Sequence, residues 1–427
     1  MHIAWLGKKS PFCGNVTYSR EITNALTDRG YDVSFFHFSH EATPDGWISS
    51  DQVNSAAIGK HGAGGMPSAA VSGLSVSGAS PSAASSKRCD VSLPCLHKST
   101  LYTIPTLKSR KVLTEALRQL KPDVVHASLA LSPIDFVLPD ICNELGLPVV
   151  ATFHPPFDRR RWNITSNTQH FAYQLYASGL AKYDRTIVFS QIQRDLLVRL
   201  GVPPDRVAVI PNGVDSQKYS PGSSDLKLRV RAERVFVYQG RIAIEKNVES
   251  LLKAWKLSNM GDKCRLLIVG DGTLTDSLRS SADEAHGIQW LGYIADEQRR
   301  IEILRGADVF ILPSFVEGLS LSLLEAMSCG VACVATDVGA DGEALEGAGI
   351  VLDPQRVTTE LQTLLPLLRD HPEMAGILGY KARQRVLERY RLDGNVSQLE
   401  TLYARLLNLE PECSEPTQAL VKPSIEL

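Results

Sequence analysis

The sequence contains no long apolar run. None approaches the ~20 consecutive apolar residues that a helix needs to cross a bilayer, so we expect no membrane-spanning helix. The opening residues, M-H-I-A-W-L, lack the basic leader and the long apolar stretch of a secretory signal. The eight cysteines include no Cys-x-x-Cys pair, which argues against a disulfide framework or a zinc site. We therefore expect a cytoplasmic protein with reduced thiols.

Charge is divided unevenly along the 427 residues, a length that indicates two or more domains. Residues 1–220 contain 22 Lys and Arg against 17 Asp and Glu, whereas the remainder contains 23 against 30. The net charge of −2 is thus the balance of +5 and −7. A basic first half suggests an anionic substrate or surface, although chance imbalance on solvated faces explains it equally well.

Strand and helix patterns alternate through most of the chain, which predicts an α/β fold with parallel sheets. We place a first domain at 1–220 and a second at 221–385, divided near the Y-S-P-G-S-S segment at 219–224. Residues 54–86 are rich in Gly, Ala, Ser and Pro and are expected to be a flexible insertion. A helix is predicted from Glu373 to Leu407, with 386–408 as its closing part and 409–427 as a disordered tail.

The most informative stretch is F-I-L-P-S-F-V-E-G-L-S-L-S-L-L-E-A-M-S-C-G at 310–330. It predicts a buried strand, a loop that contains Glu317 and Gly318, and a helix that starts near Leu319. The start of such a helix offers free N–H groups and a positive dipole end to an anion. Glu325 would lie roughly 12 Å beyond Glu317 if the intervening residues are helical. This spacing suits a nucleotide sugar, whereas the plainer alternative is a buried strand and helix with two incidental glutamates.

Other candidate residues fall where predicted strands end, which is the ligand-binding edge of a parallel sheet. Arg241 and Lys246 flank a loop after one strand and could neutralise a departing diphosphate, although each alone could be a surface charge. His154 follows another strand and could donate to a sugar or share a proton near neutral pH; it could equally be satisfied by backbone. Arg159–Trp162 could grip phosphates or a lipid surface, or could be an exposed loop.

The order of these motifs resembles that of the retaining family-4 glycosyltransferases, and the two-domain pattern with a long last helix resembles their GT-B fold. The motifs are G-R-x4-K-N at 240–247, V-G-D-G at 269–272, L-G at 291–292, P-S-x2-E-G-x6-E-A-M-x-C-G at 313–330, T-F-H at 152–154, F-S at 189–190 and I-P-N-G-V-D at 210–215. The likeness covers most of the chain outside the insertion and the tail. The resemblance implies two Rossmann-like domains that face each other across a cleft, with the acceptor side in the first.

The resemblance also implies roles for the charged candidates. Arg241 and Lys246 would hold the diphosphate, Glu325 would bind the ribose hydroxyls and Glu317 the hydroxyls of the sugar. His154 would contact the donor sugar near the reacting carbon. We accordingly predict His154, Arg241, Lys246 and Glu317 as catalytic residues.

Backbone groups would complete the donor site. Gly318, Leu319 and Ser320 would supply N–H donors, the loop with Gly14 would approach the donor, and Ile294 would meet the base. Many family members have Phe-Gly after Glu-Gly and a proline two residues later, where this chain has Leu319, Ser320 and Ser322. The departure affects the identity of the donor sugar more than the reaction.

The implied reaction is transfer of a hexose from a nucleoside-diphosphate sugar, with UDP favoured, to an acceptor hydroxyl with retained configuration. No cofactor is expected, and since Asp-x-Asp occurs nowhere in the sequence, no metal either. We predict a lipid or lipid-linked acceptor at the cytoplasmic membrane face, an anionic membrane surface as a partner, and no nucleic acid. The alternatives are a soluble sugar or polyol acceptor, a sugar-nucleotide epimerase, and a nucleotide-sugar-binding protein without catalytic activity.

Overall fold

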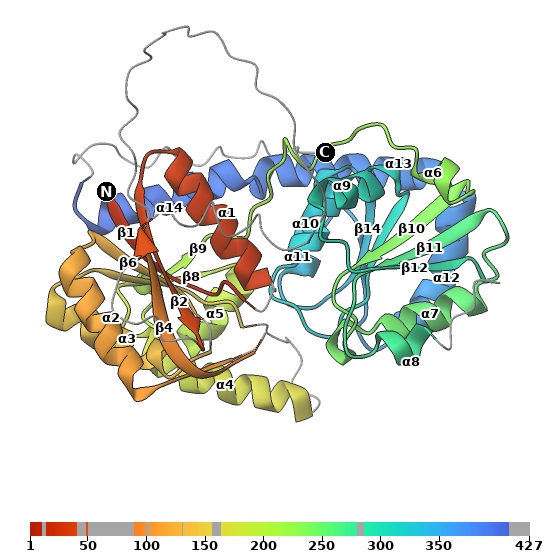
Figure 1. The fold of residues 1–427 in the computed structure, drawn as a ribbon. Helices are drawn as coiled ribbons and strands as arrows, with labels where there is room; N and C mark the ends of the chain where they lie inside the picture. The colour runs from red at the N-terminus through yellow and green to blue at the C-terminus, as the bar shows by residue number, and fades with distance from the viewer. Residues whose placement is uncertain are drawn as a thin grey trace, which may run out of the picture.

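The computed structural model describes residues 1–10, 14–40, 48–49, 89–99, 102–129, 131–155, 164–279 and 286–409. They form two α/β units, each built around one sheet (Figure 1). The predicted insertion at 54–86, the Arg159–Trp162 segment and the predicted tail beyond residue 409 lie outside the described residues.

The first sheet is formed by the N-terminal half of the chain. Its order is β3-β4-β2-β1-β6-β7-β8-β9, with β5 paired to β4, and only β3 and β5 run antiparallel to their neighbour. The strands are β1 (His2–Leu6), β2 (Asp32–Ser39), β3 (Ile48–Ser49), β4 (Cys89–Lys98), β5 (Thr103–Pro105), β6 (Val124–Ser128), β7 (Val149–Thr152), β8 (Arg185–Val188) and β9 (Val207–Val209). The carboxyl ends of β1, β6 and β7 therefore share one edge.

Strand β4 was not predicted from the sequence. It follows the Gly- and Ser-rich segment and contains Pro94, a residue that argues against a strand inside a sheet. Its pairing with β2 nevertheless buries Val91, Leu93 and Cys95 at alternate positions. The neighbouring strand, rather than local propensity, thus determines this element.

Helices connect the strands of the first unit: α1 (Gly14–Asp28), α2 (Leu107–Leu120), α3 (Ile134–Leu145), α4 (Ile164–Leu180), α5 (Gln191–Arg199) and the 3₁₀ helix η2 (Pro204–Arg206). Helix α1 forms because Tyr18, Ile22 and Leu26 recur at a four-residue spacing and bury one face against the sheet. It ends where Gly30 adopts φ +87°, a conformation that side chains disfavour.

The second unit is a sheet of order β12-β11-β10-β13-β14-β15 in which every pair is parallel. Its strands are β10 (Arg234–Gln239), β11 (Cys264–Val269), β12 (Ile288–Gly292), β13 (Val309–Leu312), β14 (Ala332–Thr336) and β15 (Ile350–Leu352). Its helices are α6 (Leu226–Arg229), η3 (Ile244–Lys246), α7 (Val248–Leu257), α8 (Thr275–Arg279), α9 (Glu297–Gly306), α10 (Leu321–Ser328), α11 (Asp341–Leu345) and α12 (Val357–Asp370). The predicted strand and helix of the 310–330 stretch are confirmed as β13 and α10.

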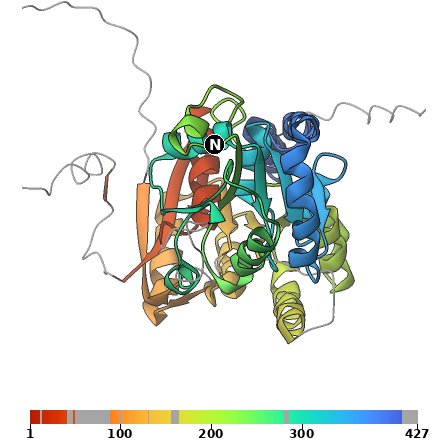
Figure 2. The ribbon, with the colours of Figure 1, turned by 90° about the vertical axis from the view of Figure 1, so that its right-hand side faces the viewer.

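The predicted helix from Glu373 to Leu407 is wrong in one respect, because the chain breaks it into α13 (Pro372–Arg389) and α14 (Leu392–Leu406). At the break, Val214 donates its N–H to Tyr390 O (2.8 Å) and Leu392 donates to Val214 O (3.0 Å). Helix α14 then returns to the first unit and packs on α1, so the blue C-terminal segment extends over both units (Figure 1). In the turned view, the blue helices lie together on one side of the molecule (Figure 2). Among the described residues, no helix is long and apolar enough to span a membrane.

Candidate active site

The loop between β13 and α10 holds a buried ion pair. Glu317 is 8% exposed, and its Oε1 accepts from Lys246 Nζ at 2.5 Å and from Ser314 Oγ at 2.8 Å. Lys246 ends η3, which follows β10, so the two residues come from loops at the carboxyl ends of neighbouring strands. The structure therefore brings together two of the residues that the sequence predicts to act on the donor.

Arg241 lies in the loop between β10 and η3 and is about half exposed. Its Nη2 donates to Glu245 Oε1 at 2.5 Å, and its carbonyl accepts from Tyr238 Oη at 2.6 Å. Gly270 of the V-G-D-G motif packs against the backbone at the start of this loop. A Cβ on Gly270 would lie 1.8 Å from the carbonyl oxygen of Gly240, so only glycine permits the approach.

Glu325 is partly buried on α10, where its Oε2 accepts from Gln239 Nε2 at 2.9 Å. Burial raises the pKa of Glu325 to about 7, and the nearby charge of Arg300 opposes this rise. Glu325, which is predicted to bind the ribose, thus has a carboxyl group whose charge changes near neutral pH. Sequence reasoning did not anticipate Gln239, although it ends β10 at the same edge of the sheet.

The start of α10 differs from the prediction at one backbone donor. Ser320 is the N-cap residue, and its Oγ accepts from Leu323 N at 3.4 Å. The N–H of Ser320 donates to Asp341 Oδ1 at 2.8 Å. This backbone donor, which was predicted to face the ligand, is therefore bonded to a side chain of the protein. Asp341 is fully buried, and burial together with the charge of Glu317 raises its pKa well above the usual range. Asp341 was not among the residues predicted from the sequence.

The predicted donor loop contacts the first unit at two points. A Cβ on Gly318 would lie 3.4 Å from the carbonyl oxygen of His154, which is van der Waals contact, so the two segments lie close together here. The carbonyl of Leu319 accepts from Asn212 Nδ2 at 2.8 Å. These contacts place the predicted donor residues and His154 on two sides of one site, which is how the sequence predicts them to be arranged.

Hydrogen bonds fix the tautomer of His154, which follows β7. Asn15 Nδ2 donates to Leu129 O (3.0 Å), so its Oδ1 accepts from Ser128 Oγ (2.8 Å). Because the Ser128 hydroxyl has a single proton, it must accept from His154 Nε2 at 2.8 Å. The ring thus carries its proton on Nε2 and offers Nδ1 as an acceptor.

The surroundings of His154 correct both of its predicted roles. Burial, and less strongly the nearby charge of Lys8, lowers the pKa of His154 to about 3, so the imidazole is neutral at physiological pH. Proton sharing near neutral pH therefore does not fit this environment. Donation to a sugar does not fit either, because Ser128 accepts the Nε2 proton, whereas Nδ1 can accept a hydrogen bond from a hydroxyl. Gly14 begins α1 beside Asn15 and so lies next to this network.

Two family models match the chain: "Glycosyltransferase Family 4" over residues 13–218 and "Glycosyl transferases group 1" over residues 233–370. The O-antigen chain mannosyltransferase B of Escherichia coli is 31% identical, with 60% of this chain and 68% of that protein covered. The chain belongs to the family-4 glycosyltransferases. It is an enzyme of the hexosyltransferase type.

Two further proteins define what this glycosyltransferase resembles. The UDP-Gal:alpha-D-GlcNAc-diphosphoundecaprenol alpha-1,3-galactosyltransferase of Escherichia coli is 26% identical, over 70% of this chain and 80% of that protein. The structure of Anabaena HepE in complex with UDP superimposes with a TM-score of 0.68 at 16% identity, and covers 95% of this chain and 100% of that one. The fold of the glycosyltransferase is therefore GT-B.

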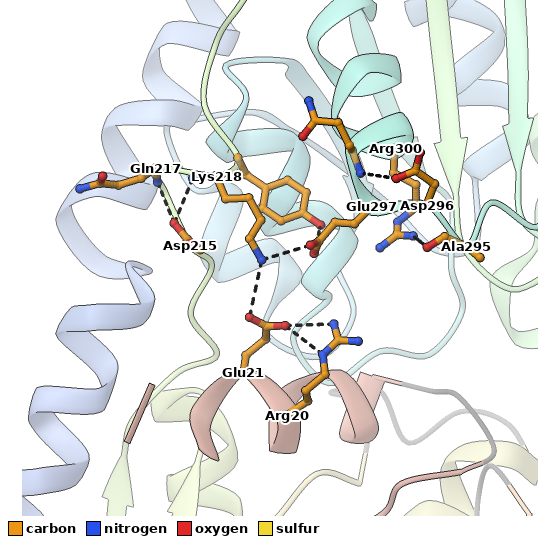
Figure 3. Close-up of polar contacts among 11 residues, drawn as sticks. Arg20, Glu21, Asp215, Gln217, Lys218, Ala295, Asp296, Glu297 and Arg300 are labelled. Atoms are coloured by element: carbon orange, nitrogen blue, oxygen red, sulfur yellow. Dashed lines mark hydrogen bonds and ion pairs between the residues drawn. The ribbon is translucent and has the colours of Figure 1, made fainter. Parts of the chain in front are cut away.

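The segment that joins the two units of the glycosyltransferase is held by a chain of charged contacts (Figure 3). Lys218 Nζ lies 3.2 Å from Glu297 Oε2 on α9 and 4.0 Å from Glu21 Oε2 on α1. Tyr219 Oη donates to Glu297 Oε1 at 3.1 Å and is near enough to Glu325 to affect the pKa of its carboxyl group. The partly exposed ion pairs add little stability, but they connect α1 through Glu297 and Tyr219 to the surroundings of the predicted ribose ligand.

Ile294 lies in the loop between β12 and α9. Its carbonyl accepts from Arg300 Nη1 at 2.8 Å. The carbonyl of Ala295 accepts from the same atom at 3.0 Å (Figure 3). The guanidinium of Arg300 thus fixes the loop that follows β12. The contact of Ile294 with the nucleotide base stays a prediction, and Arg300 is the residue that would hold it in place.

A buried hydrogen-bond chain joins α14 to the strand before His154. Tyr403 Oη lies 2.5 Å from His126 Nδ1, and His126 Nε2 lies 2.7 Å from Thr152 Oγ1, which in turn contacts Tyr18 Oη at 3.2 Å. Burial lowers the pKa of His126 to about 3, so the ring is neutral and one of its nitrogens must accept.

Tyr403→Phe should therefore destabilise the glycosyltransferase by about 1–3 kcal/mol, because a buried ring nitrogen of His126 loses its partner. The shift in the urea midpoint measures the effect. Tyr380→Phe on α13, where the side chain is 66% exposed, is the control and should leave the midpoint unchanged. Equal midpoints for Tyr403→Phe and wild type would contradict the assignment.

Proposed function

We propose that this glycosyltransferase transfers a hexose from a UDP-sugar to a hydroxyl of a lipid-linked glycan, with retention of configuration. Two buried side-chain oxygens around the donor loop carry the proposal: Gln239 Oε1 and Asn212 Oδ1 have no hydrogen-bond partner among the described residues. The amide nitrogen of Gln239 donates to Glu325, and that of Asn212 donates to the carbonyl of Leu319 in the loop. Acceptor oxygens in buried positions require donors, and a nucleotide sugar supplies several hydroxyl groups.

The chemistry proposed for the site is mainly electrostatic. The ammonium of Lys246, with Arg241, would compensate the charge that develops on the departing diphosphate. Glu317 would hold both Lys246 and the sugar hydroxyls, and His154 Nδ1 would accept from a hydroxyl near the reacting carbon. The acceptor hydroxyl would attack on the face that the diphosphate leaves, so the protein needs to position the reactants rather than supply a nucleophile.

Two kinds of relative support the choice of substrates. HepE was solved in complex with UDP, which supports a UDP-linked donor. The name of the Escherichia coli galactosyltransferase includes a diphosphoundecaprenol-linked sugar, which supports a lipid-linked acceptor. With such an acceptor, the proposed location is the cytoplasmic face of a membrane, to which the protein would bind peripherally.

A donor screen followed by an acceptor panel tests the proposal. UDP-sugars should raise the melting temperature more than GDP- or ADP-sugars, and the best donor should then be consumed only when a diphosphate-lipid-linked sugar is added. Transfer to a free sugar or polyol would instead favour a soluble acceptor. Conversion of the donor without any acceptor would indicate an epimerase, and binding without turnover a protein that only binds nucleotide sugars.

Activity should survive removal of divalent metals, because Lys246 and Arg241 are proposed to meet the diphosphate charge. The measurement is the initial rate in excess EDTA against the rate in Mg²⁺ or Mn²⁺, where we expect less than about a twofold difference, since the protein's own cations supply the charge stabilisation. Complete loss in EDTA with recovery on adding metal would show that these cations are insufficient.

A further inference from the structure

Four large apolar side chains are exposed together on the first unit. Leu96 in β4, Tyr102 and Ile104 around β5, and Leu107 at the start of α2 are 70%, 45%, 42% and 100% exposed. They belong to one hairpin, because His97 pairs with Ile104 and its ring lies 5.4 Å from that of Tyr102, with Leu96 at the register shift just before His97. Thr106 donates its N–H to Pro94 O at 3.1 Å, which holds the start of α2 against the same strand. We refer to Leu96, Tyr102, Ile104 and Leu107 as the hairpin patch.

Cations border the hairpin patch. Lys108 and Lys111 are exposed in the first turns of α2, next to Leu107, and no ion pair with a described carboxylate holds either of them. Arg110 lies between them, 3.9 Å from Glu144, and the first turn of α2 contains no acidic residue. The patch therefore combines exposed apolar groups with a positively charged margin and a positive helix end.

The hairpin lies beside the acceptor half of the site. Lys98, the last residue of β4, donates from Nζ to Ser10 Oγ at 2.8 Å, and Lys8 Nζ donates to Ser99 O at 3.3 Å. Both bonds tie the hairpin to the loop that follows β1. Lys8 is also close enough to His154 for its charge to lower the pKa of the imidazole. The hairpin is thus connected through Lys8 to the surroundings of His154.

We propose that the hairpin patch docks on an anionic lipid bilayer, with its apolar side chains in the headgroup region and Lys108 and Lys111 against lipid phosphates. Exposed apolar groups with a lysine margin fit this surface, because amphipathic elements of that composition bind anionic lipid. A protein partner fits less well, since lysine is depleted at protein interfaces. The inference rests on the proposed function and extends it: docking would bring the site to a lipid-linked acceptor.

Flotation with vesicles of phosphatidylcholine, alone or mixed with phosphatidylglycerol, tests the docking. The full chain should float with the anionic vesicles at low salt, and less at high salt because the charges are screened. Lys108→Ser with Lys111→Ser should weaken binding by about 30-fold, at roughly fivefold per cation, and should reduce the salt dependence. Tyr102→Ser with Ile104→Ser should weaken binding to both kinds of vesicle by at least about tenfold.

The second unit offers a matched control. Ile377 and Tyr380 on α13 are 58% and 66% exposed, so Ile377→Ser with Tyr380→Ser removes the same two residue types from another surface. This variant should float like wild type. Absence of wild-type flotation at low salt, or an equal loss in the control variant, would overturn the docking surface. Leu107→Ser, at a fully exposed position, repeats the test without loss of packing.

A separate readout distinguishes this inference from the proposed function. In detergent, the hairpin variants should transfer sugar to a lipid-linked acceptor as fast as wild type, because they alter docking alone. Transfer in detergent without any vesicle binding would refute the docking surface and leave the reaction intact. Vesicle binding without transfer to any lipid-linked acceptor would refute the proposed acceptor and leave the surface intact.

Discussion

Lys246→Ala is expected to lower kcat by about 10²–10³-fold and to leave the donor KM within about threefold, because the lost ammonium acts on charge that develops only in the transition state. Lys246 donates to Glu317 Oε1 at 2.5 Å, in the loop that also meets His154 at Gly318. The measurement is steady-state kinetics with the donor that the screen identifies.

Loss of Lys246 also leaves Glu317 as a buried carboxylate without its cation, which by itself could distort the loop. The double variant Lys246→Ala with Glu317→Gln separates the two causes, since it removes the stranded charge. Its kcat should stay as low as that of Lys246→Ala, whereas recovery would attribute the defect to the loop. Lys253→Ala, an exposed lysine on α7, is the matched control and should retain the wild-type kcat.

Glu325→Ala is expected to weaken donor binding by about 10- to 150-fold, which corresponds to roughly 1.5–3 kcal/mol for hydrogen bonds to a charged acceptor. The wild-type affinity should also depend on pH. Because the pKa of Glu325 is raised to about 7, the carboxylate that is proposed to accept the ribose hydroxyls is mostly protonated at pH 6. Donor affinity should therefore be about tenfold lower at pH 6 than at pH 8. Calorimetric titration over this range measures the dependence.

The same shift predicts the direction of a stability change. Between the usual value of 4.5 and about 7, Glu325 is ionised in the unfolded chain and neutral in the folded one, so stability falls as pH rises and levels off above pH 7. Glu325→Gln should thus be more stable than wild type at pH 8, by at most about 3 kcal/mol, and equal at pH 4. An unchanged pH dependence of both binding and stability in Glu325→Gln would show that another group titrates.

The parts of the fold that the sequence predicted are those that depend on local pattern. The apolar run before Pro313 predicted β13, and the spacing of apolar residues after Gly318 predicted α10. Arg241, Lys246 and Glu317 could be chosen as candidates because they follow predicted strands, and the carboxyl ends of parallel strands converge whatever their distance along the chain.

What could not be predicted depends on partners far away in the sequence. Asp341 takes the N–H of Ser320 from 21 residues away, and Tyr403 contacts His126 across 277 residues. Lys218 lies just before the predicted linker, with no local feature to show that it pairs with Glu297. The role of His154 also depended on burial, because an imidazole in water would have kept a pKa near neutrality.

The return of α14 to the first unit affects how the chain folds during synthesis. Tyr403 is fully buried against His126, whose ring stacks on Trp5 at 4.0 Å between centroids. The interior of the N-terminal unit is thus completed by residues that the ribosome adds almost 200 positions after β9. At a synthesis rate of about 5–20 residues per second, the N-terminal unit exists for roughly 10–40 s before α14 is made and can cover the His126 side chain. A chimera that takes its N-terminal unit from a relative should consequently take α14 from the same parent.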